Sequence, residues 1–150
     1  MAEERVKEAL APHRVVGIDA MVFIYHIEGN HRYRPFTHTL FKSVESGERR
    51  AVTSTLTLLE TLVKPKENKD EEMRDDYYFA LTSFPNLTLR PVDEKVAEAA
   101  AEIRARSGLR TPDAIQVATC LVEDASAFIT NDERLRKIEN PQIIIMSDYV

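Results

Sequence analysis

Four acidic residues are placed where their side chains could act together. Asp19 directly follows an apolar run at residues 15–18, and Asp132 comes two residues after a second apolar run at residues 127–130. A residue just past the carboxyl end of a buried parallel strand lies where open α/β sheets bind ligands. The other two acidic residues fall in helical patterns next to such runs. The complete set is Asp19, Glu60, Asp113 and Asp132.

Three of these residues also have a purely structural interpretation. Asp19 and Asp132 could each cap the helix that follows. Asp113 fits an ordinary helix start, in which the hydroxyl of Thr111 is the N-cap, Pro112 takes the first position and the acid faces the helix dipole. Considered one at a time, these residues therefore do not separate a cap from a functional group.

Glu60 is harder to interpret as a simple structural residue. It lies four residues after Leu56 and three before Val63, so it occupies a position in an apolar stripe of the predicted helix. A carboxylate in such a stripe needs a partner.

The four carboxylates together predict a metal site, provided that the strands before Asp19 and Asp132 are neighbours. Two bare carboxylates about 4 Å apart repel each other by roughly 4 kcal/mol at an effective dielectric constant near 20. A cluster of four therefore needs a cation. Because all the ligands are hard oxygens, they suit Mg²⁺ or Mn²⁺ and disfavour zinc or copper.

The rest of the chain alternates between short apolar runs and longer helical patterns. This alternation predicts a three-layer α/β/α sandwich with a mostly parallel five-stranded sheet and right-handed crossovers. Pro12 and Pro65 are expected to end the helices before them. Strands are predicted at 15–18, 51–53, 87–89, 127–130 and 143–146, and helices at 1–10, 21–27, 37–44, 54–63, 67–83, 92–106, 114–122 and 132–137.

Composition restricts the class of protein. With 150 residues, 43% of them hydrophobic, the chain is expected to form one domain over residues 1–150, with residues 1–13 as a lead-in helix. The net charge of −5 opposes broad coating of a nucleic acid, so such a ligand needs local basic patches or a metal. Cys120 is the only cysteine, and the sequence shows neither a signal segment nor a membrane-spanning run, so a cytoplasmic location is expected.

In four stretches the sequence resembles the PIN domain family, the metal-dependent ribonuclease fold that includes the VapC toxins of toxin–antitoxin pairs. Residues 16–25 are similar to the first motif of the family, a strand that ends in Asp before an aliphatic and aromatic helix. Residues 54–60 resemble the second motif, a hydroxyl residue followed by a helical Glu. Residues 113–119 resemble the third, an Asp before a small-residue helix, and residues 128–132 the fourth, a strand that ends in Thr-x-Asp. The resemblance extends over residues 15–146.

The resemblance implies a ribonuclease whose four carboxylates are catalytic and hold one or two Mg²⁺ or Mn²⁺ ions. Asp19 and Asp113 are the expected direct ligands. Asp132 is expected to be a further ligand, directly or through water, and Glu60 to ligate the metal or orient the nucleophile. Thr130 either supports the cluster with its hydroxyl or is simply a strand-favouring residue.

Basic side chains near the cluster are candidates to contact the RNA backbone. Arg110 precedes the third motif and Arg134 follows the fourth, although each has an equally simple interpretation as a solvated surface charge. The full set on the expected rim is Arg32, Arg34, Arg110, Arg134, Arg136 and Lys137.

The resemblance also implies partners. A homodimer is expected and, if the protein is a toxin, a small antitoxin protein that blocks the acidic cleft. Tyr77, Tyr78 and Phe79 either belong to a partner surface or pack internally.

One position departs from the family pattern. The family usually has a small polar residue, often Asn or Ser, two places after the first Asp, and this chain has Met21. The change removes a side chain expected to hydrogen-bond beside the metal, which predicts altered metal affinity or substrate placement. Met21 and the acidic net charge favour an alternative, a non-catalytic PIN-like binding or scaffold module whose acids only cap helices. The complete set of four carboxylates opposes this alternative.

Overall fold

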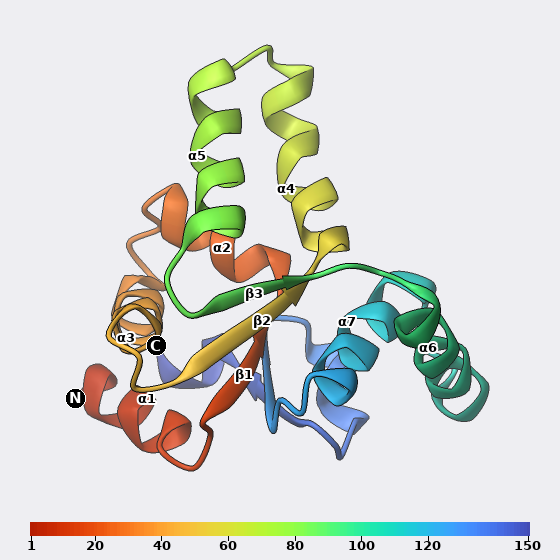
Figure 1. Cartoon of the computed structure of the whole chain (residues 1–150). Coiled ribbons are helices and arrows are strands. Elements are labelled where there is room, and N and C mark those ends of the chain that lie inside the picture. The colour runs from red at the N-terminus through yellow and green to blue at the C-terminus, as the bar shows by residue number, and fades with distance from the viewer.

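The computed structural model describes all 150 residues and contains one five-stranded sheet in which every strand pairing is parallel (Figure 1). The strand order is β3-β2-β1-β4-β5, so β1 is central and the chain first builds the sheet to one side and then to the other. The predicted fold class is thus confirmed. The strands are β1 (Val15–Ile18), β2 (Arg50–Ser54), β3 (Leu87–Arg90), β4 (Ala127–Thr130) and β5 (Gln142–Ile145).

Helices cover both faces of the sheet. The elements α1, α2, α3 and α5 contribute to the core on one face, and α6, α7 and η1 to the core on the other. The helices α4 and α5 form a pair that projects beyond the sheet (Figure 1). The helices are α1 (Ala2–Leu10), α2 (Ala20–Ile27), α3 (Arg34–Glu45), α4 (Thr55–Glu67), α5 (Glu71–Ser83), α6 (Glu94–Ser107) and α7 (Thr111–Val122), with 3₁₀ turns η1 (Glu133–Lys137) and η2 (Met146–Tyr149).

Successive residues of the central strand β1 face opposite sides of the sheet, so the strand contacts both cores. Val16 and Ile18 are fully buried against α1, α2 and α3, on the first face. Gly17 faces the other side, where a Cβ would lie only 2.2 Å from the Sγ atom of Cys120 in α7. Glycine at this position therefore lets α7 approach the sheet closely, which brings the start of α7 near the end of β1.

The topology places β1 beside β4, as the metal hypothesis required. Their register pairs Ile18 with Ile129, so both strands end at the same edge of the sheet. The chain reverses its direction of sheet building between these two strands, which is the switch point where open α/β sheets bind ligands. Asp19 and Asp132 follow the two strand ends.

Two proline predictions had different outcomes. The helix α1 ends at Leu10, just before Pro12, as expected. Pro65 does not end α4, which continues through it to Glu67. The missing N–H removes one hydrogen bond in the last turn, while the buried ring of Pro65 keeps its packing and its carbonyl still accepts the N–H of Asp70 at 2.9 Å.

Other differences concern where helices begin. The helix α3 begins at Arg34, before the predicted start at residue 37, because Pro35 in its first turn needs no hydrogen-bond partner. The helix α5 begins at Glu71, where the side chain of Asp70 accepts the N–H of Met73 at 3.0 Å.

Candidate active site

The structure brings all four predicted acidic residues to the wall of one cavity of about 590 Å³. The cavity opens at the carboxyl edge of the sheet and is framed by α2, α4, the start of α7 and the segment that follows β4. Thr130, Arg110 and Arg134 line the same cavity. The four carboxylates predicted to form a site therefore line one cavity, and their roles in metal binding and catalysis stay predictions.

Asp19 is both a helix cap and a member of the cavity wall. It is the N-cap of α2, and its Oδ1 accepts the N–H of Ala20 at 2.8 Å. Its Oδ2 accepts the hydroxyl of Thr130 at 2.6 Å. Burial raises the pKa of the Asp19 carboxyl, and the neighbouring carboxylates of Asp113 and Asp132 raise it further. The two interpretations of this residue are therefore compatible.

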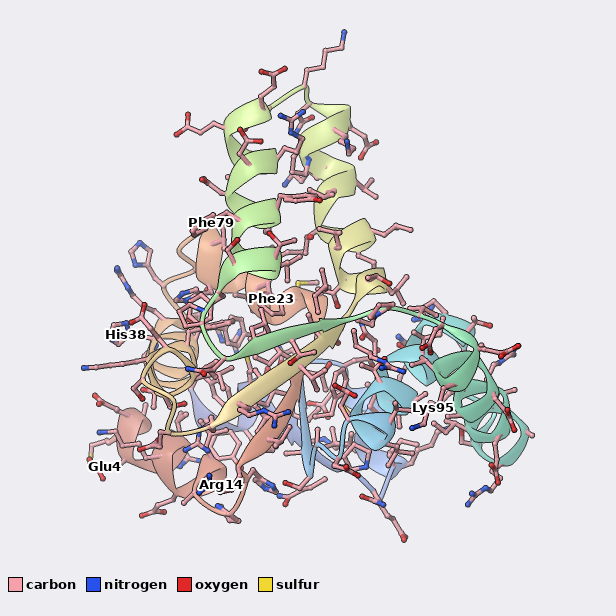
Figure 2. All side chains as sticks on the ribbon, viewed as in Figure 1. Glu4, Arg14, Phe23, His38, Phe79 and Lys95 are labelled. Carbon is pink, nitrogen blue, oxygen red and sulfur yellow. The ribbon has the colours of Figure 1, made fainter.

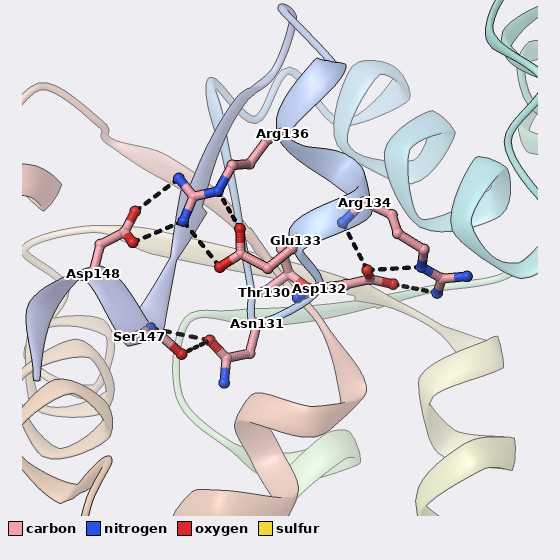
Figure 3. A network of polar contacts seen from close by, with 8 residues as sticks. All are labelled: Thr130, Asn131, Asp132, Glu133, Arg134, Arg136, Ser147 and Asp148. Carbon is pink, nitrogen blue, oxygen red and sulfur yellow. Dashed lines mark hydrogen bonds and ion pairs between the residues drawn. The ribbon is translucent and has the colours of Figure 1, made fainter.

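Asp132 caps η1 and is held by an arginine. Its Oδ1 accepts the backbone N–H of Arg134 at 3.0 Å and the guanidinium Nε at 2.9 Å (Figure 3). These hydrogen bonds lower the pKa of the Asp132 carboxyl. The backbone N–H of Asp132 also donates to the Thr130 hydroxyl at 3.1 Å, so Thr130 connects Asp132 to Asp19.

Asp113 lies in the first turn of α7, where a carboxylate is favoured by the helix dipole. Its side chain is 17% exposed, and its Oδ2 lies 3.4 Å from the Nε of Arg110 and 3.9 Å from the Nη2 of Arg134. The predicted hydroxyl cap is wrong, since the N-cap is Arg110 and Thr111 belongs to the helix without a capping hydrogen bond.

Glu60 reaches the cavity for a different reason from the one expected. The buried face of α4 consists of Thr57, Thr61 and Pro65, whereas Val63 is 47% exposed. The apolar stripe that contained Glu60 is thus not a core stripe, and the carboxylate is exposed toward the cavity without a hydrogen bond or an ion pair. Partial burial raises its pKa, and so do the carboxylates of Asp19 and Asp113.

The donor chemistry of the cavity suits a divalent cation, but no coordination sphere is already assembled. Burial raises the pKa of Asp19 and of Glu60, and the neighbouring carboxylates raise both further, which marks a local excess of negative charge on hard oxygen donors. However, no three acidic, histidine or cysteine side chains lie close enough together to hold one metal ion. Asp113 and Asp132 instead share the guanidinium of Arg134. A metal in this site would have to displace that guanidinium.

A buried chain of hydrogen bonds beneath the cavity was not predicted. Ser54 donates to the Oε1 of Gln116 at 3.0 Å, and the Nε2 of Gln116 donates to Thr57 at 2.9 Å. Thr57 and Thr53 lie 2.7 Å apart, and Thr53 reaches the carbonyl of Ile18 at 2.8 Å. The hydroxyl of Thr53 is the donor in both contacts, so its single proton is shared between the Thr57 hydroxyl and the Ile18 carbonyl. The chain thus connects α7 to the backbone next to Asp19 and fixes their relative position.

A second hydrogen-bond network joins the segment after β4 to η2 (Figure 3). The carbonyl oxygen of the Asn131 side chain accepts both the N–H and the hydroxyl of Ser147, at 3.0 and 2.6 Å. Its amide donates to the Tyr33 hydroxyl at 2.9 Å. Arg136 pairs with Asp148 and with Glu133, and it does not itself line the cavity. The loop that holds Asp132 is therefore fastened to the end of the chain.

Only two of the candidate basic residues line the cavity, namely Arg110 and Arg134. Lys137 donates to the carbonyl of Ser107 at 3.1 Å, and the Arg32 guanidinium lies 5.3 Å from the centroid of the Tyr33 ring. Fewer basic residues therefore surround the cavity than the sequence predicted.

The fold and the acidic cavity define an α/β domain with a site at the switch point of its sheet. The family model of the PIN domain matches residues 16–141, and the chain belongs to this family, which is one of nucleases. Among curated proteins, none matches the chain in sequence. No helix of the chain is long and apolar enough to cross a membrane.

Solved structures share the fold at low sequence identity. A chain of a toxin–antitoxin complex from Klebsiella pneumoniae is 19% identical, with a TM-score of 0.66, and the alignment covers 87% of this chain and 97% of that chain. A chain of VapBC2 from Rickettsia felis, bound to a DNA fragment from its promoter, is 15% identical, with a TM-score of 0.69 and coverage of 87% and 98%. At these identities the likenesses show the architecture alone.

Proposed function

We propose that this protein is a metal-dependent ribonuclease that hydrolyses RNA phosphodiester bonds with Mg²⁺ or Mn²⁺. The observation that carries the proposal is the meeting of four distant carboxylates in one cavity, where burial, and after it the neighbouring carboxylates, raises the pKa of Asp19 and of Glu60. Strongly perturbed acids in a cleft are typical of functional sites. Membership of a nuclease family supports the same conclusion.

The residues have distinct roles in this proposal. A divalent ion, when bound, lowers the pKa of a water molecule and neutralises charge on the scissile phosphate. Asp19 and Asp113 are the direct ligands, and Asp132 completes the set. Glu60, which is free of other partners, accepts a proton from the attacking water. Thr130 holds the Asp19 carboxylate in one orientation through its hydroxyl.

Arg134 has a second role, which follows from its present contacts. It neutralises Asp132 and approaches Asp113, so it compensates the cluster when no cation is bound. Asp113 and Asp132 would hold a metal in place of this guanidinium, which would leave Arg134 free at the rim of the cavity. Released Arg134 and Arg110 then bind the phosphate oxygens of the RNA strand, since a guanidinium matches phosphate geometry.

The partners follow from the relatives and from the surface. The structural relatives come from toxin–antitoxin complexes, so we propose that the protein is a toxin with an antitoxin partner and forms a homodimer. The exposed side chains of Tyr78 (53%) and Phe79 (68%) on α5 supply apolar surface for such contacts, whereas Tyr77 is buried. Figure 2 shows Phe79 on this helix. The buried free thiol of Cys120 is consistent with the reducing cytoplasm.

A non-catalytic scaffold is the second candidate. It is favoured by one observation, namely that Asp113 and Asp132 already pair with arginines and no three acids converge on a metal position. A scaffold with these ion pairs would retain the fold and a protein-binding surface without hydrolysis.

The test is RNA cleavage by the purified protein with Mn²⁺, with Mg²⁺ and with EDTA, on structured and unstructured RNAs. The proposal expects metal-dependent cleavage that is lost in Asp19→Asn and in Asp113→Asn and retained in Asp75→Asn, an exposed acid on α5. Cleavage that survives in both site variants or in EDTA would point to a contaminating nuclease. Metal binding without cleavage of any RNA would favour the scaffold.

A further inference from the structure

The acidic cavity has one wall of a different character. Met21, Ile24 and Tyr25 line it together with the carboxylates. Positions three and four residues apart share one face of a helix, so these three side chains form a continuous strip on α2. Met21 is 43% exposed, and Ile24 and Tyr25 are half-buried. An exposed apolar strip inside a charged cavity is not needed for metal binding.

The ring of Tyr25 is held in place from behind. It stacks on the ring of Tyr33, with centroids 4.4 Å apart and planes inclined by 17°. Tyr33 is buried, and its hydroxyl accepts the amide of Asn131 at 2.9 Å and lies 3.3 Å from the Ser147 hydroxyl. The strip is therefore a rigid surface, anchored to the same loop that positions Asp132.

We propose that Met21, Ile24 and Tyr25 form a subsite for one unpaired nucleobase of the RNA strand, adjacent to the phosphate that is cleaved. The subsite rests on the ribonuclease function proposed above and deepens it. A nucleotide combines an anionic group with a flat apolar ring, and the cavity offers both counterparts. Its charged part has carboxylates for a metal and two arginines for phosphate, and the strip on α2 faces the same space.

The strip selects for single-stranded RNA. In a duplex both faces of a base are covered by its neighbours, whereas an unpaired base is free to stack on an aromatic side chain. The cavity volume of about 590 Å³ lies within the roughly 300–1,000 Å³ of small-molecule sites, which leaves space for a nucleotide beside the carboxylates. Met21, which is 43% exposed, extends the apolar surface to the carboxylate end of the strip.

The test compares two fluorescent strands that differ only in their bases. One is a single-stranded RNA octamer, and the other is an octamer of the same length and charge with abasic ribose at its inner positions. Binding is followed by fluorescence anisotropy with Mg²⁺ in the Asp113→Asn background, in which hydrolysis is expected to be at least about 100-fold slower. The variants are Tyr25→Ala and Met21→Ser, and the matched control is Phe79→Ala, an exposed aromatic residue outside the cavity.

The subsite predicts that the RNA binds more tightly than the abasic strand and that each variant lowers this preference, by about 5- to 100-fold for Tyr25→Ala. Met21→Ser changes an exposed residue, so its effect does not depend on the fold. Phe79→Ala is expected to leave the preference unchanged. Equal affinity for the two strands, absence of binding to both, or a preference that neither variant changes would overturn the subsite and leave the strip to a protein partner.

Cleavage by the wild-type protein separates this proposal from the ribonuclease function. Base-dependent binding without metal-dependent cleavage would support the subsite and reject hydrolysis. Cleavage without base dependence would reject the subsite and keep hydrolysis.

Discussion

The two edges of the sheet treat buried charge in opposite ways. At the amino edge, the buried guanidinium of Arg49 donates to the carbonyls of Leu10 and His13 at 2.6 and 2.8 Å. It also donates to Ser43 and Glu48, each at 2.9 Å, so each of its three nitrogens has a partner. At the carboxyl edge, four carboxylates share a cavity, and that of Glu60 has no partner.

This difference separates residues that stabilise the fold from residues that are available for chemistry. A buried charge with complete hydrogen bonding supports structure, and its removal leaves unsatisfied groups. A cluster of like charges is destabilising by itself and is retained where something else uses it. Substitutions at the carboxyl edge are therefore expected to lower activity, and substitutions at the amino edge are expected to lower stability.

The largest expected effect is on activity at the carboxyl edge. Asp113→Asn should lower RNA cleavage by at least about 100-fold, because it removes a metal ligand. The melting temperature without metal should stay close to that of the wild type, since the loss of repulsion from Asp19 and Glu60 is offset by the loss of the contacts with Arg110 and Arg134. Calorimetry and a cleavage assay on the same preparation measure both quantities, and a large fall in melting temperature would assign Asp113 to the fold instead.

The next effect is on stability at the amino edge. Arg49→Met should lower the free energy of unfolding by about 3 kcal/mol, because two buried carbonyls lose their donor. For a chain of this size each kcal/mol corresponds to about 2–4 °C in melting temperature. Cleavage by the folded variant at low temperature should be unchanged. An Arg49→Met protein as stable as the wild type would contradict the role assigned to this guanidinium.

A smaller effect is expected where the carboxyl edge is held in position. Thr130→Val removes a hydrogen bond that lowers the pKa of Asp19, so that pKa should rise further. The acidic limb of the pH–rate profile should then move to higher pH, with a loss of roughly 10-fold in rate at pH 7. Thr130→Ser, which keeps the hydroxyl, is the control. Equal profiles for the Val and Ser variants would show that the hydroxyl has no role.

The smallest effect is the pH dependence of the amino edge. Burial lowers the pKa of His13 below its ordinary value of 6.5, and the positive Arg49 contributes in the same direction. Folding therefore favours neutral His13, whose contribution is present above pH 6.5 and is lost as the pH falls through its lowered pKa. Its neighbours are the Ser126 hydroxyl, 2.7 Å from Nδ1, and the Gln142 amide oxygen, 3.1 Å from Nε2.

The measurement is the melting temperature between pH 7.5 and 5 for the wild type and for His13→Gln. The wild type should lose about 2 °C more than the variant over this range. The same dependence of melting temperature on pH in both proteins would show that His13 does not contribute to the pH dependence of stability.

Much of the site could be predicted because its signals are local. Asp19 and Asp132 directly follow apolar strands, and neighbouring strands in an alternating α/β chain bring such ends together. Gln116 could not be predicted, since its partner Ser54 is 62 residues away and a lone glutamine in an apolar helix does not reveal it. Glu60 was placed correctly on a wrong premise, because the period of an apolar stripe does not show which side of α4 is buried.

The central claim concerns the divalent ion, and calorimetric titration with Mn²⁺ tests it most directly. The account predicts saturable binding to the wild-type protein, at least about 10-fold weaker in Asp19→Asn and Asp113→Asn and unchanged in Asp75→Asn. Wild-type protein that binds no Mn²⁺, or site variants that bind it as well as the wild type, would contradict the claim that these carboxylates form a metal site.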